Sequence, residues 1–320
     1  MDADTLVVRR NLSVETLTKA IADGTSLWVD ITEPTTEELT WLQDCLDLHP
    51  LVIQDLKRVD TRPTLLAYTN YIFLSLFQPK QALSELSGSE IHCIIGENVF
   101  VTVRYSDTSA VDDAYDRVAK NPNYWQRDVV YFLYITMQTV IDSYYPIVDH
   151  ISNKLNDLEE ALLGEGSNDV ARHSVYRMKQ QLIGLRQMIA PQREVVSNVI
   201  GEERLSRDNE NRDLFRHLYE RLMRVYDLID SQRDLSSNVL DLIQSDESQR
   251  LGRAVNRLTI FSMIFLPLTF ITGLFELNFI NTTNQFELPI SGTVLFGGII
   301  VTMILIVSVM ILYFRQQRWL

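Results

Sequence analysis

The sequence has few of the residues on which metal sites and many active sites depend. Its 320 residues include two cysteines, Cys45 and Cys93, without the paired spacing of a metal site or a disulfide framework. We expect both to be small buried residues of a protein in a reducing compartment. The five histidines are scattered, and each is expected to be an ordinary surface or core residue: His49, His92, His150, His173 and His217.

Catalytic signatures are also missing. The chain contains no HExxH motif, no glycine-rich phosphate loop, no cluster of Cys and His, and no nucleophile elbow. These absences predict that the protein is not an enzyme and that it holds no prosthetic group.

Charge is absent from two long stretches near the C-terminal end. Residues 258–275 form a run of 18 uncharged residues, and residues 288–314 form a run of 27. As helices they would be about 27 Å and about 40 Å long, and about 20 residues suffice to cross a bilayer core. Two buried core helices are the alternative, but a core helix of this length normally keeps a polar face, and the second run has none. We therefore expect two transmembrane helices.

The segment between the two runs lacks basic residues, whereas the segments outside them are basic. The linker 276–287 has two charged residues, both glutamates, while arginines flank the runs at Arg250, Arg253, Arg257, Arg315 and Arg318. By the positive-inside rule the linker lies outside the cell and both termini are cytoplasmic. The start, MDADTLVVRR, is too polar for a signal peptide. We expect a multi-pass protein of the cell inner (plasma) membrane, with the lipid bilayer as a partner.

The net charge of -13 belongs wholly to residues 1–257. Such an acidic cytoplasmic body argues against nucleic acid as a partner and against broad docking on anionic lipid. Solubility alone would explain the acidity, and so would the attraction of cations. Composition does not separate these two interpretations.

Residues 1–122 have the pattern of a mixed α/β domain. Short apolar or alternating runs predict strands at TLVVRR, SLWVDI, YIFLSLF, EIHCIIG and NVFVTVR. The last two should form a hairpin at Gly96. Between the early strands, TTEELTWLQDCLDL predicts an amphipathic helix that follows Pro34 and is capped by a threonine.

From Asn123 onward the pattern becomes helical. Residues 145–163 carry apolar side chains three or four apart and are followed by Gly164 and Gly166, and a second helix over 175–200 has a candidate kink at Pro191. Residues 211–251 contain no Pro or Gly and keep helical spacing at Leu214, Leu218, Leu222, Val225, Leu228 and Leu235. This pattern continues into the first uncharged run. A helix of about 65 residues would be near 100 Å long, more than a monomer usually buries, so the stalk predicts a bundle of copies.

The first uncharged run is the better candidate for lining a pathway. It contains Thr259, Ser262, Pro267, Thr269, Thr272 and Gly273, whereas the second run is richer in aliphatic residues. The alternative is that these hydroxyl groups bond the carbonyls of their own helix or connect neighbouring helices. Periodicity does not decide between the two.

Several segments together resemble the CorA-type divalent-metal transporters, the two-span GxN family. They are LHPLVIQDLKRVDTRPTLLAYTNYIFLSLF, APQREVV, YDLIDSQRDLSSNVLDL, IFLPLTFITGLFELNF and YFRQQRWL, and their order and spacing cover most of the chain. The resemblance implies an α+β cytoplasmic funnel domain, a long stalk helix and two C-terminal transmembrane helices in a membrane homopentamer. The pathway would then lie on the five-fold axis, with the first span inside and the second outside.

The end of the first span departs from the family pattern, in which an aromatic residue precedes Gly-Met-Asn. Here Phe275 precedes the tripeptide and Asn278 is kept, but Glu276 stands in place of Gly and Leu277 in place of Met. A ring of amide oxygens would bind the outer face of a hydrated magnesium ion, which loses water reluctantly. An inward Glu276 would attract cations strongly and tolerate zinc, and an outward one would only make the vestibule more negative. Both orientations remain open.

The family's pore positions map onto one face of the first span, because they follow one another at steps of three or four. With the two residues of the mouth, Asn278 and Glu276, the predicted pore and selectivity positions are Gly273, Thr269, Leu266, Ser262, Leu258, Val255 and Gly252. Thr269 would be a hydroxyl ring, and Leu258 and Leu266 would be apolar collars that stop ions by dewetting, or else ordinary interhelical packing. Asp241 falls where the family often has an acidic ring. Asn278 and Asp241 are thus the predicted contacts of a hydrated cation.

The predicted function is transport of magnesium or zinc, with cobalt or nickel as further candidates, through an axial pore. The divalent cation is the substrate and a candidate gating ligand, although no regulatory site is assigned; Asp107, Asp112 and Asp113 are expected to be a solvated run. The alternative is a non-conducting membrane-anchored oligomer that senses metal or serves as a scaffold. The predicted segments are 1–122 (α/β domain), 123–257 (helical bundle and stalk), 258–275 (first span), 276–287 (extracytoplasmic loop), 288–314 (second span) and 315–320 (basic cytoplasmic tail).

Overall fold

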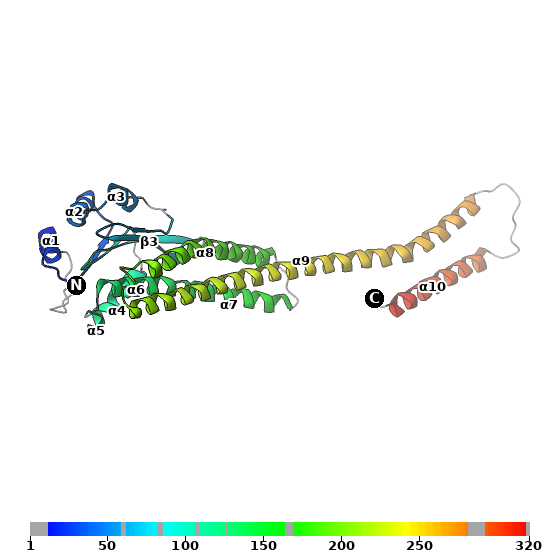
Figure 1. The fold of residues 1–320 in the computed structure, drawn as a ribbon. Helices are drawn as coiled ribbons and strands as arrows, with labels where there is room; N and C mark the ends of the chain where they lie inside the picture. Colours follow the sequence, from blue (N-terminus) through cyan, green and yellow to red (C-terminus); the bar gives the residue numbers. More distant parts are fainter. Residues whose placement is uncertain are drawn as a thin grey trace. The chain divides into compact units, whose positions relative to one another are not determined.

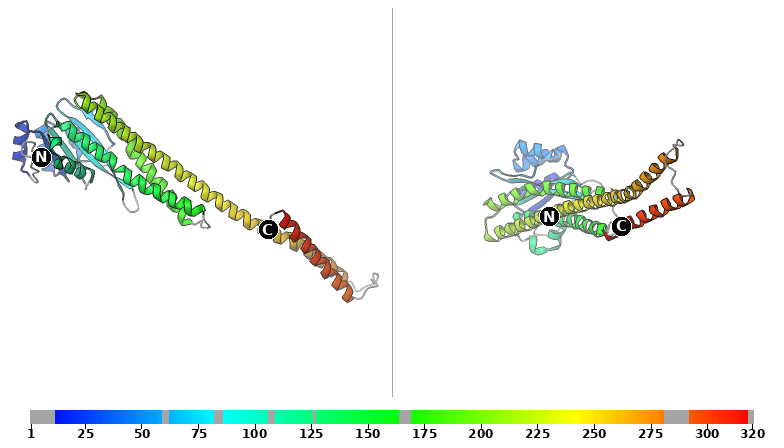
Figure 2. Two further views of the ribbon diagram at one scale, coloured as in Figure 1. Left: turned by 90° about the horizontal axis from the view of Figure 1, so that it is seen from below. Right: turned by 90° about the vertical axis from the view of Figure 1, so that its right-hand side faces the viewer.

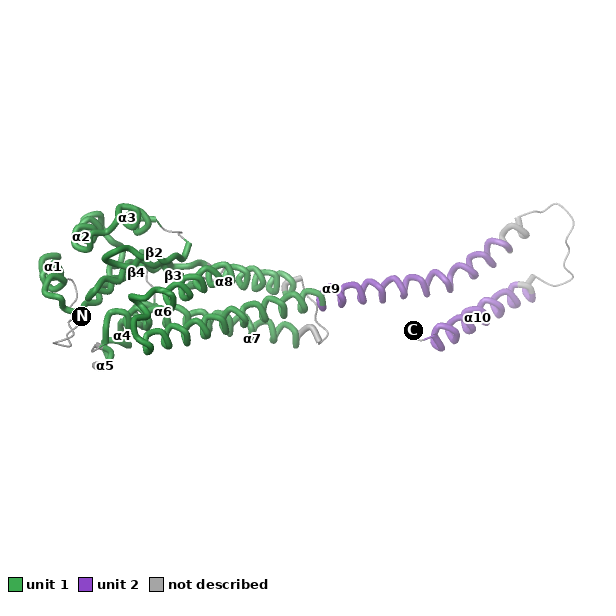
Figure 3. The backbone as a smooth tube through the Cα atoms, in the orientation of Figure 1, with its two compact units in different colours: residues 1–241 green, residues 242–320 purple. Residues whose placement is uncertain are grey.

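The chain forms two compact units, Met1–Asp241 and Leu242–Leu320 (Figure 3). The structure, a computed structural model, describes residues 12–58, 62–81, 86–105, 109–125, 127–163, 169–280 and 292–317. The first unit contains a β-sheet and most of the helices, and the described part of the second is helical (Figure 1). The strand predicted over residues 5–10, the glycines at 164 and 166, and the centre of the linker at 281–287 lie outside the described residues.

A five-stranded mixed sheet is the centre of the first unit. Its strands are β1 (Leu27–Thr32), β2 (Leu65–Ala67), β3 (Ile72–Gln81), β4 (Leu86–Ile95) and β5 (Val99–Arg104), in the order β1-β5-β4-β3-β2. β1 is parallel to β5, and the other pairs are antiparallel. Four predicted strands and the hairpin at Gly96 are confirmed. β2 was missed because its three residues are too few to show alternation.

One face of the sheet is covered by α1 (Val14–Ala22), α2 (Thr36–Leu46) and α3 (Pro50–Leu56). The predicted amphipathic helix is α2, and its threonine cap is Thr35. The amide nitrogen of Thr35 donates to Glu38 Oε2 at 2.7 Å, and the amide nitrogen of Glu38 donates to Thr35 Oγ1 at 3.2 Å. This reciprocal capping box fixes the start of the helix. Leu39 and Leu42 of α2 are buried in the core against the sheet.

The other face of the sheet is covered by α6 (Val129–Asp142), with α4 (Ser109–Lys120) packed against it and the short α5 (Pro122–Trp125) following α4. Nearly every side chain of α6 is buried, because this helix contacts four strands as well as α4 and α7. Trp28 of β1 stacks on Phe132 of α6 with ring centroids 5.8 Å apart. The strands and α6 thus share one core.

Three long helices complete the first unit and lie alongside one another (Figures 1 and 2): α7 (Tyr144–Leu163), α8 (Asp169–Gly201) and the start of α9 (Asn209–Ile280). Pro191 lies inside α8, which remains one helix. α9 has 72 residues, about 108 Å at the usual rise, and passes through Gly252 without a break, as predicted.

The apolar face of α9 in the first unit differs from the predicted one at three positions, since Leu214 and Leu235 are only half-buried and Leu228 is exposed. Leu218, Leu222 and Val225 are fully buried, but Leu228 is 39 % exposed and Ile229 is buried in its place. Residues three or four positions apart lie on the same side of a helix, and after Val225 the buried face continues with the residue four positions on, Ile229.

The second unit contains the rest of α9 and α10 (Gly292–Gln316), and the ends of both helices differ from the predicted spans. α9 continues to Ile280, so residues 276–280 are helical where a loop was predicted. Glu and Leu are good helix formers and the segment has no Gly or Pro, so a change to polar residues does not end the helix. α10 likewise includes Arg315 and Gln316, which were predicted to belong to the tail.

Candidate functional site

The predicted pore positions of α9, all of them exposed except the half-buried Gly273, form one stripe, which we call the Gly252–Gly273 stripe: Gly252, Val255, Leu258, Ser262, Leu266, Thr269 and Gly273. Because α9 is helical throughout, their spacing of three or four places them on one side of it. Val255, Leu258 and Leu266 are 61 %, 69 % and 72 % exposed. Apolar side chains in this number are not left in water, so a surface outside the chain must cover them.

The rest of both apolar segments is equally uncovered by the chain itself. Beyond Ile243, the buried residues among those described are Ile260 on α9 and Phe314 on α10. The described residues include two helices long and apolar enough to cross a membrane, and 6 % and 0 % of their most apolar windows are buried. A soluble core helix would be mostly covered, so this exposure favours lipid and other copies of the chain as neighbours.

The threonine hydroxyl groups of α9 bond to their own helix. Thr269 Oγ1 donates to the carbonyl of Phe265 at 2.9 Å, and Thr259 and Thr272 make similar bonds. The structure therefore contains the bonds expected if these hydroxyl groups only satisfy carbonyls of their own helix. They can still line a pathway, since a hydroxyl oxygen that donates its proton to a carbonyl keeps lone pairs that accept from water. Thr269 can satisfy its helix and still present an acceptor to a hydrated ion.

The backbone at the outer end of α9 sets the register of the Glu276–Asn278 tripeptide. The helix remains regular through Ile280, and each residue turns it by about 100°. Position 276 is then one turn beyond Gly273 and adjoins the stripe. Position 278 is about 140° from Gly273 around the helix. The role of Asn278 as a cation contact remains a prediction.

Asp241 lies on the exposed surface of α9, at the junction between the two compact units. Its carboxylate is available to solvent and to a cation, and its role also remains a prediction. In the parts of the chain that the structure describes, no group of three or more His, Cys, Asp or Glu side chains could hold a metal ion.

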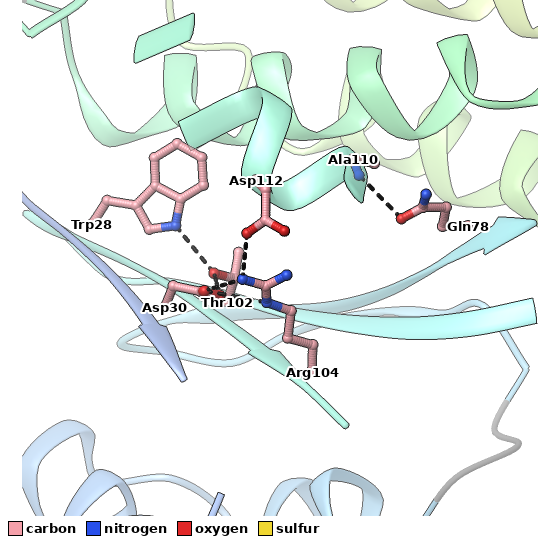
Figure 4. Close-up of polar contacts among 7 residues, drawn as sticks. All are labelled: Trp28, Asp30, Gln78, Thr102, Arg104, Ala110 and Asp112. Carbon is pink, nitrogen blue, oxygen red and sulfur yellow. Dashed lines mark hydrogen bonds and ion pairs between the residues drawn. The ribbon is translucent and has the colours of Figure 1, made fainter. Parts of the chain in front are cut away.

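A polar cluster that sequence reasoning missed joins α4 to the sheet (Figure 4). Arg104, at the end of β5, donates to Asp30 of β1 at 2.8 Å and to Asp112 of α4 at 2.6 Å. Burial alone would lower the pKa of the Arg104 guanidinium, but its bonds to Asp112 and the charge of Asp30 raise it. Asp112 is thus paired, although it was expected in a solvated run, and Asp113 is exposed. Asp107 lies outside the described residues.

The same cluster extends to both sides of Arg104. Thr102 donates to Asp30 at 2.7 Å and accepts from the indole nitrogen of Trp28 at 3.1 Å. Further along the sheet, Gln78 donates to the hydroxyl of Ser109 and accepts from the amide of Ala110, which holds the first turn of α4 (Figure 4). The polar residue Asp30 inside the apolar strand SLWVDI was the available signal, because a buried carboxylate requires a partner.

His92 on β4 is fully buried and is the one histidine with an unusual environment among the described residues. Neither ring nitrogen has a hydrogen-bond partner, the ring stacks on Phe73, and Nε2 lies 3.7 Å from Glu90 Oε1. Burial lowers the pKa of His92 to about 4, so the imidazole is neutral near pH 7. This fits the expectation of a core histidine. Cys93, next to it, is buried, and Cys45 is half-buried.

The two units define an α+β soluble domain followed by a long helix and two apolar helices, an architecture of membrane proteins that carry a large domain on one side of the bilayer. The family model of the CorA-like Mg2+ transporter protein matches residues 23–316, and the chain belongs to that family.

Three relatives illustrate the similarity. The cobalt/magnesium transport protein CorA of Thermotoga maritima is 25 % identical over 97 % of this chain and 88 % of that protein. The zinc transport protein ZntB of Yersinia enterocolitica is 25 % identical over 79 % of this chain and 76 % of that protein. The solved structure of the CorA magnesium transporter from Methanocaldococcus jannaschii has a TM-score of 0.80 at 19 % identity, over 92 % of both chains. This structural similarity shows the fold.

Proposed function

We propose that this protein transports divalent metal cations through an axial pore that five copies of α9 form in the cell inner (plasma) membrane. Family membership supports a transporter, and the relatives' names span cobalt, magnesium and zinc. The observation that carries the proposal is that the stripe residues lie on one side of a single continuous helix, where the chain itself does not cover them. A pore explains why small and hydroxyl residues (Gly252, Ser262, Thr269 and Gly273) share one side of an apolar helix. Both termini would be cytoplasmic.

Each part of the stripe has a proposed task. Leu258 and Leu266 would be apolar collars that stop ions by dewetting, and Thr269 would contact the ion's water shell. At the outer end, Asn278 or Glu276 would attract and select the cation. Asp241 would concentrate cations at the cytoplasmic end. The cation is substrate here, and it is also a candidate gating ligand.

A flux assay with purified protein in liposomes tests the proposal. We expect magnesium, zinc, cobalt or nickel to enter protein-containing vesicles and not empty ones. Leu266→Asn should raise the basal flux by wetting a collar. Leu268→Asn is the matched control, because it makes the same change two residues farther along α9, about 160° around the helix from Leu266. Flux of no divalent ion, or equal effects of the two variants, would contradict the axial pore.

The non-conducting alternative makes a different prediction in cells. If the chain only senses metal or serves as a scaffold, Asn278→Ala and Glu276→Gly would leave cellular metal content unchanged. The transport names of the relatives favour the conducting protein.

A further inference from the structure

Three arginines lie together on α9 just before its uncharged run. Arg250, Arg253 and Arg257 are spaced three and four residues apart, so they share one side of the helix. At about 100° per residue, this side is roughly opposite the Gly252–Gly273 stripe. If the stripe faces the axis of an assembly, the arginines face outward from it.

The charge of Arg253 and Arg257 is not neutralised by nearby side chains. Arg250 is paired with Asp246, with Nε and Oδ2 2.9 Å apart. Arg253 and Arg257 are both exposed, and neither forms an ion pair with any residue that the structure describes. Two unpaired guanidinium groups therefore remain on the outward side of the helix.

The second unit as a whole offers these arginines little acidic charge. Its acidic residues are Asp246, Glu247, Glu276 and Glu287. Glu276 is 19 residues beyond Arg257, about 28 Å along the helix. Around Arg257 the chain is thus locally basic, although the whole protein carries a net charge of -13.

α10 brings a third arginine to the same region. Its C-terminal end returns toward the part of α9 where the uncharged run begins (Figures 1 and 2). Phe314, near this end, and Ile260, just beyond Arg257, are the two described residues that the apolar helices bury there. Arg315 follows Phe314 directly and is exposed. Three exposed guanidiniums thus lie where two uncharged helical segments meet polar sequence.

We infer that Arg253, Arg257 and Arg315 form a binding surface for anionic phospholipid head groups at the cytoplasmic leaflet. The inference rests on the proposed membrane location. Guanidinium groups form paired bonds with phosphate oxygens, and basic residues next to a membrane span are attracted to anionic lipid. The surface is local, and it is compatible with an acidic body that does not dock broadly on the membrane.

The association of spin-labelled lipids with the full-length protein in phosphatidylcholine liposomes tests this surface. Electron paramagnetic resonance measures the fraction of labelled phosphatidylglycerol, and separately of labelled phosphatidylcholine, that the protein immobilises. The wild type should prefer phosphatidylglycerol, and Arg253→Gln/Arg257→Gln should reduce the preference by about fivefold. Arg253→Lys/Arg257→Lys should keep most of it, and high salt should weaken it.

The matched control is Arg216→Gln/Arg224→Gln, which removes the same charge from exposed positions near the other end of α9. It should leave the lipid preference unchanged. The inference is overturned if the Arg253/Arg257 variant keeps the full preference, or if the control loses as much. If the Arg253/Arg257 variant keeps the preference but the oligomer dissociates, the arginines bind an acidic surface of another copy instead. A chain that does not enter the bilayer would immobilise neither lipid, and this separates failure of the membrane location from failure of the arginine surface.

Discussion

The two parts of α9 differ in the burial of their apolar side chains. Between Asn209 and Ile243, the helix buries Phe215, Leu218, Leu222 and Val225 completely against its own chain. From Leu251 to Leu274, most of the leucines and phenylalanines of the same helix are exposed, and Ile260 is the one buried residue. Both parts are regular helix, so local conformation does not distinguish them. What differs is the surface that covers the apolar groups.

This difference assigns the stability of the two parts to different sources. The first part is stabilised by removing apolar area from water within one chain, at about 25 cal/mol per Å2. The second gains little of this kind from its own chain, since Ile260 is its one buried residue from Leu251 to Leu274, and it depends on lipid and on neighbouring copies. The first unit can therefore fold through its own core, whereas the apolar segment needs a membrane to be stable.

The largest expected effect tests this comparison directly. Leu222→Ala should destabilise the first unit by about 2–5 kcal/mol, because it leaves a cavity at a fully buried position. Leu266→Ala, the same change on the exposed part, should alter the unfolding of that unit by less than about 0.5 kcal/mol. Urea unfolding of the full-length protein in detergent, followed by the fluorescence of the buried Trp28, measures both. Equal losses would mean that the two parts are not separate.

Acid should weaken the first unit through His92. Its pKa is about 4 in the folded protein and about 6.5 when unfolded, so between these values the unfolded chain binds more protons. The stability is complete above about pH 6.5 and is lost as the pH falls toward 4, by about 3 kcal/mol in total. Urea unfolding at a series of pH values measures the slope.

His92→Phe separates this residue from the other titrating groups. The phenyl ring keeps the stacking on Phe73 and cannot take up a proton, so the loss of stability between pH 6.5 and 4 should shrink. Glu90, 3.7 Å from His92, is the acidic group that faces the ring and belongs in the same titration. His173→Phe is the control on α8, at an exposed position, and should keep the full acid sensitivity. An unchanged slope in His92→Phe would assign the sensitivity to carboxylates.

A somewhat smaller effect is expected from the cluster that joins α4 to the sheet. Arg104→Met should cost about 2 kcal/mol, because Asp30 keeps its charge in a mostly buried place and loses its partner. Lys120→Met breaks an exposed pair with Asp116 and should cost less than about 0.5 kcal/mol. The same unfolding assay compares the two. If both cost the same, the cluster would be an ordinary surface ion pair.

Most of the fold could be predicted because its signals are local. Alternation revealed four strands, the Thr35–Glu38 box revealed the start of α2, and the absence of Pro and Gly revealed an unbroken α9. The errors occur where the signal is weak or the outcome depends on tertiary structure. The three residues of β2 are too few to show a periodic pattern. Whether Leu228 or Ile229 is buried depends on the position of the neighbouring helices.

The candidate site was predictable in outline and less so in detail. The spacing from Gly252 to Gly273 is enough to define the stripe, since helical periodicity does not depend on the residues that pack against it. The predicted end of the helix was wrong, because the polarity that begins at Glu276 indicates a loop while the backbone there remains helical. Asp30 inside an apolar strand signalled that a partner was needed, but the partners of the Arg104 cluster could not be named, because Asp30 and Asp112 are 82 positions apart in the sequence and only the packing of α4 on the sheet brings them together.

The smallest expected effect concerns one hydroxyl group on the exposed part of α9. Thr269 and Thr272 both donate to carbonyls of their own helix, but only Thr269 belongs to the stripe. Thr269→Ala should lower divalent-cation flux into liposomes by about two- to threefold, since one weak water contact per subunit is lost. Thr272→Ala removes an equivalent bond at a position outside the stripe, about 60° around α9 from Thr269, and should leave the flux as it is. If both variants lower the flux equally, the hydroxyl groups only stabilise the helix. The two parts of α9 would then differ in what surrounds their apolar side chains, and no polar side chain of the second part would have a role in transport.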